Sequence, residues 1–230
     1  MPRATASSGR TGRPPATSRA QILTAARRLI DRDGWEKLTI RRLATEAGVG
    51  ATTLYHHVRD KEDLLIQLLN EFAEQVERPE PPDDPRDRIV QVATVTHDAL
   101  KSWPWAAEVL TSDGFIARLS QDSLWLVDEI LDGAIEHGCT PAQAVDVFRH
   151  LWYYTVGEIL VRLHTARKLS DADRESFTLS HIDPARLPRL AEVGDQWGDL
   201  AQRDVYPDGL RAFVDGLLAR AAAARAGDCS

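Results

Sequence analysis

The stretch LTIRRLATEAGVGATTLYHHV, residues 38–58, decides the fold at the N-terminal end of this chain. Small Ala44 lets two helices approach closely, and Gly48, four residues later, suits the left-handed backbone that leaves a helix through a sharp turn. Val49 and Leu54 are then placed to pack the second helix against the first. The pattern predicts a helix-turn-helix, a unit that inserts its second helix into the major groove of DNA.

Helix signals surround this stretch on both sides. Ser18 and Gln21 form a capping box that starts a first helix, and Gly34 ends it. Thr39 caps a second helix, and a third follows at about 51–57. Asp60 caps a fourth helix, expected to run to Arg78 with an apolar stripe made by Leu65, Leu68, Leu69, Phe72 and Val76. The sequence therefore predicts a three-helix DNA-binding domain over residues 18–64.

The rest of the chain also has helical patterns. A proline-rich acidic loop is expected at 78–85, followed by helices at about 86–101, 105–111, 120–137, 141–167 and 207–225, with one more short helix within 183–198. No strand-like alternation of useful length is present. We therefore predict an all-α protein in which a larger C-terminal helical domain over 65–226 follows the three-helix domain.

Charge is distributed unevenly along the 230 residues. The net charge is −7, yet residues 1–60 hold 11 Lys and Arg against 5 Asp and Glu, and the remainder holds 17 against 30. A basic end on an acidic body fits a protein that meets phosphates with one end. Residues 1–17 are expected to be a disordered basic tail, in which Arg3, Arg10 and Arg13 either enter a minor groove or, as we favour, attract phosphates without specificity or do not act on DNA at all.

Several other classes of protein are not expected. There is no membrane span and no signal peptide, and Cys139 and Cys229 are too few for a disulfide framework or a four-ligand zinc site, which suits the cytoplasm. No Gly-rich phosphate loop, nucleophile elbow or His-Glu-x-x-His motif indicates an enzyme, and no metal site or cofactor is predicted. Two alternatives remain for residues 38–58: two short helices of an ordinary bundle, or an adaptor that binds protein instead of DNA.

The motifs resemble a known family. The segments TIRRLA at 39–44, AGV at 47–49, TLYHHV at 53–58 and DKEDLL at 60–65 look like the DNA-binding signature of the TetR family of transcriptional regulators. The resemblance implies that Thr39, Tyr55 and Lys61 hold phosphates. It also implies that a second group lies in or beside the major groove: Arg41, Thr52, Thr53, His56 and His57. Arg42 is either a further phosphate contact or a surface residue, and no pH switch is expected of the two histidines.

The same resemblance implies what the larger domain does. Such a regulator is a homodimer, formed here by the helices near 141–167 and 207–225, and it represses by binding double-stranded operator DNA of palindromic sequence. It encloses a cavity for an unidentified small-molecule effector, expected here to be hydrophobic or aromatic. A metal–tetracycline complex is not expected, because 108–113 lacks the matching histidine. The candidate cavity residues, any of which could instead be ordinary core or surface, are His97, Trp103, Trp105, Phe115, Trp125, Trp152, Tyr153 and Arg162.

Overall fold

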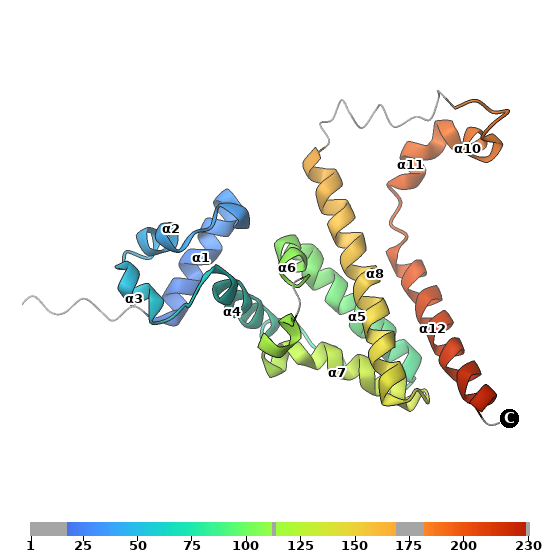
Figure 1. The fold of residues 1–230 in the computed structure, drawn as a ribbon, viewed down its shortest axis with the longest axis horizontal. Helices are drawn as coiled ribbons and strands as arrows, with labels where there is room; N and C mark the ends of the chain where they lie inside the picture. Colours follow the sequence, from blue (N-terminus) through green and yellow to red (C-terminus); the bar gives the residue numbers. More distant parts are fainter. Residues whose placement is uncertain (1–17, 112–113, 169–181, 229–230) are drawn as a thin grey trace, which may run out of the picture. The chain divides into compact units, whose positions relative to one another are not determined.

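A computed structural model describes residues 18–111, 114–168 and 182–228 (Figure 1). Within these ranges the chain forms helices and turns and no strand, which confirms the all-α prediction. The chain divides into two compact units, Met1–Leu68 and Leu69–Ser230.

The first unit holds three helices, a 3-10 turn and the start of a fourth helix. They are α1 (Arg19–Asp33), η1 (Trp35–Lys37), α2 (Ile40–Glu46), α3 (Ala51–Tyr55) and α4 (Lys61–Ala73). The predicted capping box is present, since the Ser18 amide donates to Gln21 Oε1 at 3.0 Å and the Gln21 amide donates to Ser18 Oγ at 3.3 Å. Ile22, Ala26 and Leu43 are completely buried and form the centre of this unit.

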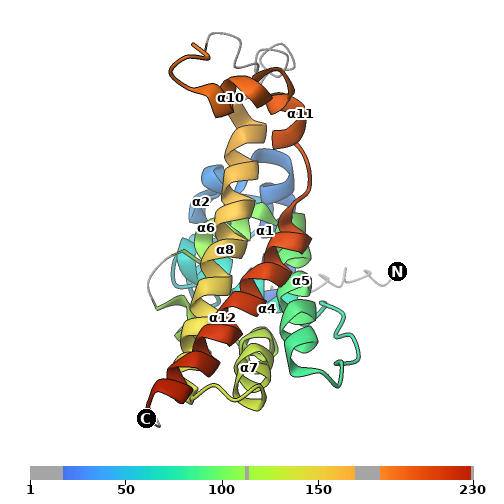
Figure 2. The ribbon, with the colours of Figure 1, turned by 90° about the vertical axis from the view of Figure 1, so that its right-hand side faces the viewer.

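The second unit is built from longer helices. They are α5 (Pro85–Ser102), α6 (Pro104–Val109), η2 (Phe115–Arg118), α7 (Gln121–Glu136), α8 (Pro141–Lys168), α10 (Pro188–Val193), η3 (Gly194–Gln196), α11 (Trp197–Ala201) and α12 (Tyr206–Asp228). Helices α8 and α12 lie side by side, and α12 also packs on α5 (Figure 2). The core between them includes Ile89, Leu151, Tyr206 and Leu210, none more than 2% exposed.

Two predicted boundaries are wrong. The fourth helix ends at Ala73 and not at Arg78, because the amides of Gln75 and Val76 bond three residues back and tighten the chain into turns. Pro85, expected in the loop, is the first residue of α5. Asp84 caps that helix by accepting from the Asp87 amide at 2.9 Å, and proline is well tolerated at this position because it has no amide hydrogen to satisfy.

The remaining predictions on the whole chain have mixed outcomes. Helix α10 lies within 183–198, where one short helix was expected, whereas α11 and the three 3-10 turns η1, η2 and η3 were not predicted. In the described part of the chain, no helix combines the length and the hydropathy that crossing a membrane requires. The arginines of the tail and Cys229 lie outside the described residues.

Candidate functional site

The turn between α2 and α3 is made at Gly48. Its φ of 67° lies in the left-handed region, as the sequence predicted. The Gly48 amide donates to the Thr45 carbonyl at 3.2 Å and the Val49 amide to the Ala44 carbonyl at 3.0 Å, so the chain closes α2 and turns within a few residues. A Cβ added at Gly48 would meet no atom within 4 Å, so the backbone conformation alone favours glycine here.

Helix α3 is anchored from one side and solvated on the other. Leu54 is completely buried, as is Leu43 of α2. The remaining side chains of the turn-following helix point away from the core of this unit, and Tyr55 is 57% exposed. The exposed candidates are Thr52, Thr53, Tyr55 and His56, with His57 half-buried at the end of the helix. This unit therefore offers a short, rigidly seated helix with hydroxyl and aromatic groups facing solvent.

The two polar residues at the start of α2 have different surroundings. Thr39 caps the helix, because its Oγ1 accepts from the Arg42 amide at 3.2 Å. The Arg42 guanidinium forms an ion pair with Asp33 and donates to the Lys37 carbonyl at 2.9 Å. Arg42 thus ties α2 to the end of α1 and to η1, which favours a structural role over a phosphate contact. Arg41 is exposed.

Lys61 is held in place at the first residue of α4. Its Nζ donates to the Glu36 carbonyl at 3.2 Å and lies 4.7 Å from the centroid of the Trp35 ring. Burial against this ring lowers the pKa of the Lys61 ammonium from its usual range. The ammonium therefore has a defined position at the edge of the helix-turn-helix, fixed by the unpredicted turn η1.

The second unit contains a cavity of about 100 Å³. Its wall is almost entirely apolar and is contributed by the end of α4 and by α5, α7 and α8, for example by Leu69, Phe72, Leu100, Leu126 and Leu151. Among the described residues that line it, none carries a charged side chain. The polar side chains of the wall are Thr96, Ser123, Trp152 and Thr155.

Two of the eight predicted cavity residues are in this wall. Phe115 and Trp152 both line the cavity, with ring centroids 5.3 Å apart. Trp103 and Trp105 lie outside the wall, where Trp103 stacks on the lining residue Phe72 at 4.3 Å.

Trp125 and Tyr153 are also outside it. Trp125 donates its indole hydrogen to Glu129 at 3.1 Å and lies beneath Arg78, while Tyr153 is 60% exposed on α8. A helical pattern shows that a residue is aromatic but not which of several neighbouring helices it faces.

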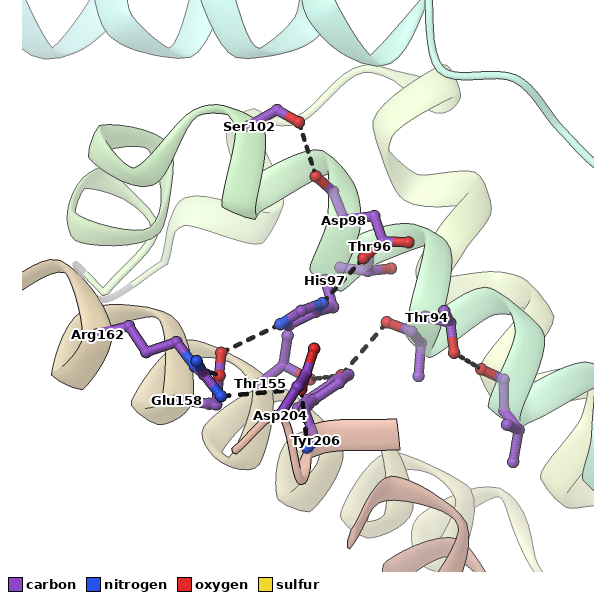
Figure 3. A network of polar contacts seen from close by, with 12 residues as sticks. Thr94, Thr96, His97, Asp98, Ser102, Thr155, Glu158, Arg162, Asp204 and Tyr206 are labelled. Atoms are coloured by element: carbon purple, nitrogen blue, oxygen red, sulfur yellow. Dashed lines mark hydrogen bonds and ion pairs between the residues drawn. The ribbon is translucent and has the colours of Figure 1, made fainter. Parts of the chain in front are cut away.

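His97 and Arg162 belong to a polar network and not to the cavity wall (Figure 3). His97 is buried, and its Nε2 and Nδ1 lie 3.1 Å and 3.0 Å from carboxylate oxygens of Glu158 and Asp98. Arg162 pairs with the same Glu158 and lies 3.7 Å from Asp204. The network therefore links α5 and α8 to the residues just before α12.

Tyr206 connects this network to the cavity. Its ring stacks on His97 with 3.8 Å between centroids, and its hydroxyl lies 2.8 Å from Oγ1 of Thr155, a wall residue (Figure 3). Burial raises the pKa of Tyr206 to about 12. Neither Thr155 nor Tyr206 was predictable as a site residue, because a threonine and a tyrosine within helical patterns look like ordinary surface or core.

The described residues contain no group of three or more His, Cys, Asp or Glu side chains that could hold a metal ion.

Two family models match the sequence. "Bacterial regulatory proteins, tetR family" matches residues 22–68, and "Tetracyclin repressor-like, C-terminal domain" matches residues 78–221. The first match spans the helix-turn-helix, and the second spans α5, α7 and α8, which contribute to the cavity wall together with the end of α4. Together they account for most of the chain.

Individual proteins agree with this assignment. An HTH-type transcriptional regulator of Saccharopolyspora erythraea is 34% identical over 99 residues, which are 43% of this chain and 42% of that protein. The HTH-type transcriptional repressor DrrR1 of Streptomyces coeruleorubidus is 25% identical over 220 residues, which cover 90% of this chain and 79% of the relative. The crystal structure of ActR from Streptomyces coelicolor in complex with (S)-DNPA shares the fold, with a TM-score of 0.73, 20% identity and coverage of 90% and 99%. The chain belongs to the TetR family of bacterial transcriptional regulators.

Proposed function

We propose that this regulator is a repressor that binds a palindromic operator as a homodimer and leaves it when a small apolar molecule occupies the cavity of the second unit. The observation that carries the proposal is the exposed helix α3, seated by Leu54 directly after the left-handed turn at Gly48. Such a helix has the shape and the solvated side chains that major-groove recognition needs.

The DNA contacts divide into two kinds. Thr52, Thr53 and His56 are exposed on or at the end of α3 and are proposed to reach base edges, together with Arg41 and His57. Thr39, Tyr55 and Lys61 are proposed to hold phosphates and to fix the register of the helix. The Thr39 oxygen already accepts the Arg42 amide, so its hydroxyl hydrogen remains to donate to a phosphate oxygen.

Helices α8 and α12 are proposed to form the dimer interface. Apolar side chains on α8 are exposed to solvent in the single chain, with Val145 at 45%, Tyr153 at 60% and Val161 at 66%. A two-fold symmetric pair would cover them and place two copies of α3 in successive major grooves, about 34 Å apart. This arrangement explains why a palindromic site is expected.

The proposed switch uses α4. This helix carries Lys61 at its first residue, and Leu69, Phe72 and Ala73 near its end line the cavity. A ligand that prefers a different position of these lining residues would move the helix and change the affinity for DNA. Coupling of this kind between two sites typically amounts to about 1–3 kcal/mol.

The test begins with selecting a duplex from random sequences and measuring its affinity by gel shift. Thr53→Ala and Tyr55→Ala are each expected to weaken binding by about 5- to 150-fold, because each removes a contact worth about 1–3 kcal/mol. Thr111→Ala, an exposed threonine of the second unit, is the matched control and should bind normally. Unchanged affinity in both α3 variants would contradict the proposal and favour a protein-binding role for this unit.

A further inference from the structure

The polar groups in the cavity wall differ in what they can offer to a ligand. Three hydroxyls, on Thr96, Ser123 and Thr155, and the indole of Trp152 are the polar side-chain groups among the described lining residues. A hydroxyl has one hydrogen to donate and two lone pairs that accept. The hydrogen bonds within the protein determine which of these capacities remain for a bound molecule.

Two of the three hydroxyl hydrogens are used locally. Thr96 Oγ1 donates to the Val92 carbonyl of the same helix at 2.8 Å. Ser123 Oγ donates to Oδ1 of Asn70 at 2.9 Å and lies 3.2 Å from the Ser120 hydroxyl. Both oxygens can still accept a hydrogen bond, but neither has a hydrogen left to give.

For the third hydroxyl, that of Thr155, the direction of the hydrogen bond follows from the partners of Tyr206. The Tyr206 hydroxyl lies 2.8 Å from Thr155 Oγ1 and 3.4 Å from the Ala93 carbonyl, which can only accept. If Thr155 donates to Tyr206 and Tyr206 donates to Ala93, both hydrogens have acceptors. The opposite direction would leave the Thr155 hydrogen without a protein acceptor at a residue that is 3% exposed, which costs free energy. Thr155 therefore also presents only lone pairs.

We infer that the cavity selects uncharged, mainly apolar molecules that donate a hydrogen bond, such as a phenol, over the same skeleton carrying an acceptor or an ionised group. The inference rests on the proposed function only in taking this cavity as the effector site. A phenolic hydroxyl would find acceptors on Thr96 or Thr155, whereas a ligand carbonyl or ether would find no hydroxyl hydrogen there and, among the described lining side chains, could accept only from the Trp152 indole.

The same wall also disfavours the binding of charged ligands. Its described lining residues include no Lys, Arg, His, Asp or Glu. A carboxylate or an ammonium would lose its hydration without gaining a partner, which is far costlier than burying a neutral group. The volume of about 100 Å³ compares with roughly 150 Å³ in an engineered cavity that holds benzene, so a single-ring molecule is the appropriate probe.

The test compares four probes by calorimetric titration of the full-length protein. 4-Ethylphenol donates, 4-ethyltoluene is its apolar isostere, 4-ethylanisole only accepts, and 4-ethylbenzoate is an anion. We expect 4-ethylphenol to bind, 4-ethylanisole to bind less tightly and 4-ethylbenzoate not to bind. Ala99→Leu, which fills part of the cavity from a lining position, should remove the binding of every probe.

Threonine variants separate the donor contact from simple burial. Thr155→Val and Thr96→Val keep the shape of the wall, and at least one should raise the Kd of 4-ethylphenol by about 5- to 10-fold while changing that of 4-ethyltoluene less than twofold. Thr155→Ser, which keeps the hydroxyl, should retain most of the affinity. Two separate threonines are used, because Thr155→Val also removes a contact of Tyr206.

Several results would overturn the inference. One is that the valine variants weaken 4-ethylphenol and 4-ethyltoluene equally, or that neither valine variant has an effect. Others are that 4-ethylbenzoate binds tightly, or that 4-ethylanisole binds more strongly than 4-ethylphenol and Trp152→Phe abolishes that binding. The last two are that probes still bind to Ala99→Leu, or that no probe binds to the wild type. The proposed function has a separate readout, because operator binding by α3 is measured without these probes. A protein that binds its duplex but shows no donor preference would lose this inference and keep its role as a DNA-binding regulator.

Discussion

At the residue scale, a substitution at Gly48 tests the backbone conformation alone, because the added side chain meets no neighbouring atom. Gly48→Ala should lower the free energy of unfolding of the first unit by about 1–2 kcal/mol, because a residue with a Cβ resists a φ of 67° while the new methyl group touches nothing within 4 Å. Urea denaturation followed by circular dichroism measures the change. Thr45→Ala, at an exposed position of α2 in the same unit, is the control and should change the stability by less than about 0.5 kcal/mol. Equal effects of both substitutions would show that the left-handed turn is not what requires glycine.

The raised pKa of buried Tyr206 predicts that the folded protein loses stability at alkaline pH. Its folded-state pKa is raised by burial to about 12 from 10, so its contribution is complete below pH 10 and is lost as the pH rises toward 12. Between pH 9 and pH 11 the stability of the wild type relative to Tyr206→Phe should fall by about 1.4 kcal/mol. Urea denaturation at the two pH values gives this difference. Tyr55→Phe, which removes an exposed hydroxyl of the first unit, is the matched control, and a Tyr206 effect no larger than that of Tyr55 would contradict the assignment.

Single residues also show where sequence reasoning reaches its limit. Gly48 was predictable because the need for a positive φ is a local property of the turn. The role of Arg42 was not, since its partners Asp33 and the Lys37 carbonyl are brought near only when α1, η1 and α2 pack together. The same holds for Thr155, whose importance depends on Tyr206, 51 residues further along the chain.

At the scale of elements, the close approach of α5 and α7 depends on Gly133. A Cβ at this position would lie 2.9 Å from both the Pro85 carbonyl oxygen and Ile89 Cγ1, and the backbone oxygen cannot move aside cheaply. Gly133→Ala is therefore expected to destabilise the second unit by about 1–3 kcal/mol, despite the better helix propensity of alanine. Thermal unfolding measures it. Ser102→Ala, at an exposed position of α5, is the control and should be nearly neutral. A neutral Gly133→Ala would mean that the two helices can separate.

The position of each helix along the chain was more predictable from the sequence than the other helices that it contacts. Capping boxes are short-range patterns, and the one at Ser18 starts α1 where the sequence placed it. The cavity depends instead on which faces of α4, α5, α7 and α8 meet. Aromatic content suggested Trp125 and Tyr153 for its wall, whereas aliphatic residues such as Leu69 and Leu126 supply most of it. An apolar stripe has the same appearance whether it borders a filled core or a hollow one.

At the scale of the whole molecule, the uneven distribution of charge matches the proposed roles of the two parts of the chain, DNA binding by the first and effector binding by the second. The basic excess lies in residues 1–60 and the acidic excess in the remainder, so the net charge of −7 conceals a phosphate-attracting end. The acidic remainder would repel DNA and limit approach by the wrong surface. Charge distribution thus supports the proposal that residues 1–60 face DNA, independently of the helix-turn-helix motif.

Assembly gives the prediction that tests the whole proposal. Val161 is 66% exposed on α8, at the proposed two-fold interface, so Val161→Glu would introduce a carboxylate from each subunit. Desolvated like charges cost several kcal/mol, and the dimer dissociation constant should therefore rise by at least about 100-fold. Sedimentation velocity should show monomers, and gel shifts should show much weaker operator binding, since one subunit contacts only one half-site. Ile135→Glu, on α7 and 44% exposed, is the matched control and should leave both measurements unchanged. If Val161→Glu stays dimeric with full affinity, then this face of α8 is not what joins the subunits, and the spacing of the two recognition helices must be set by another surface.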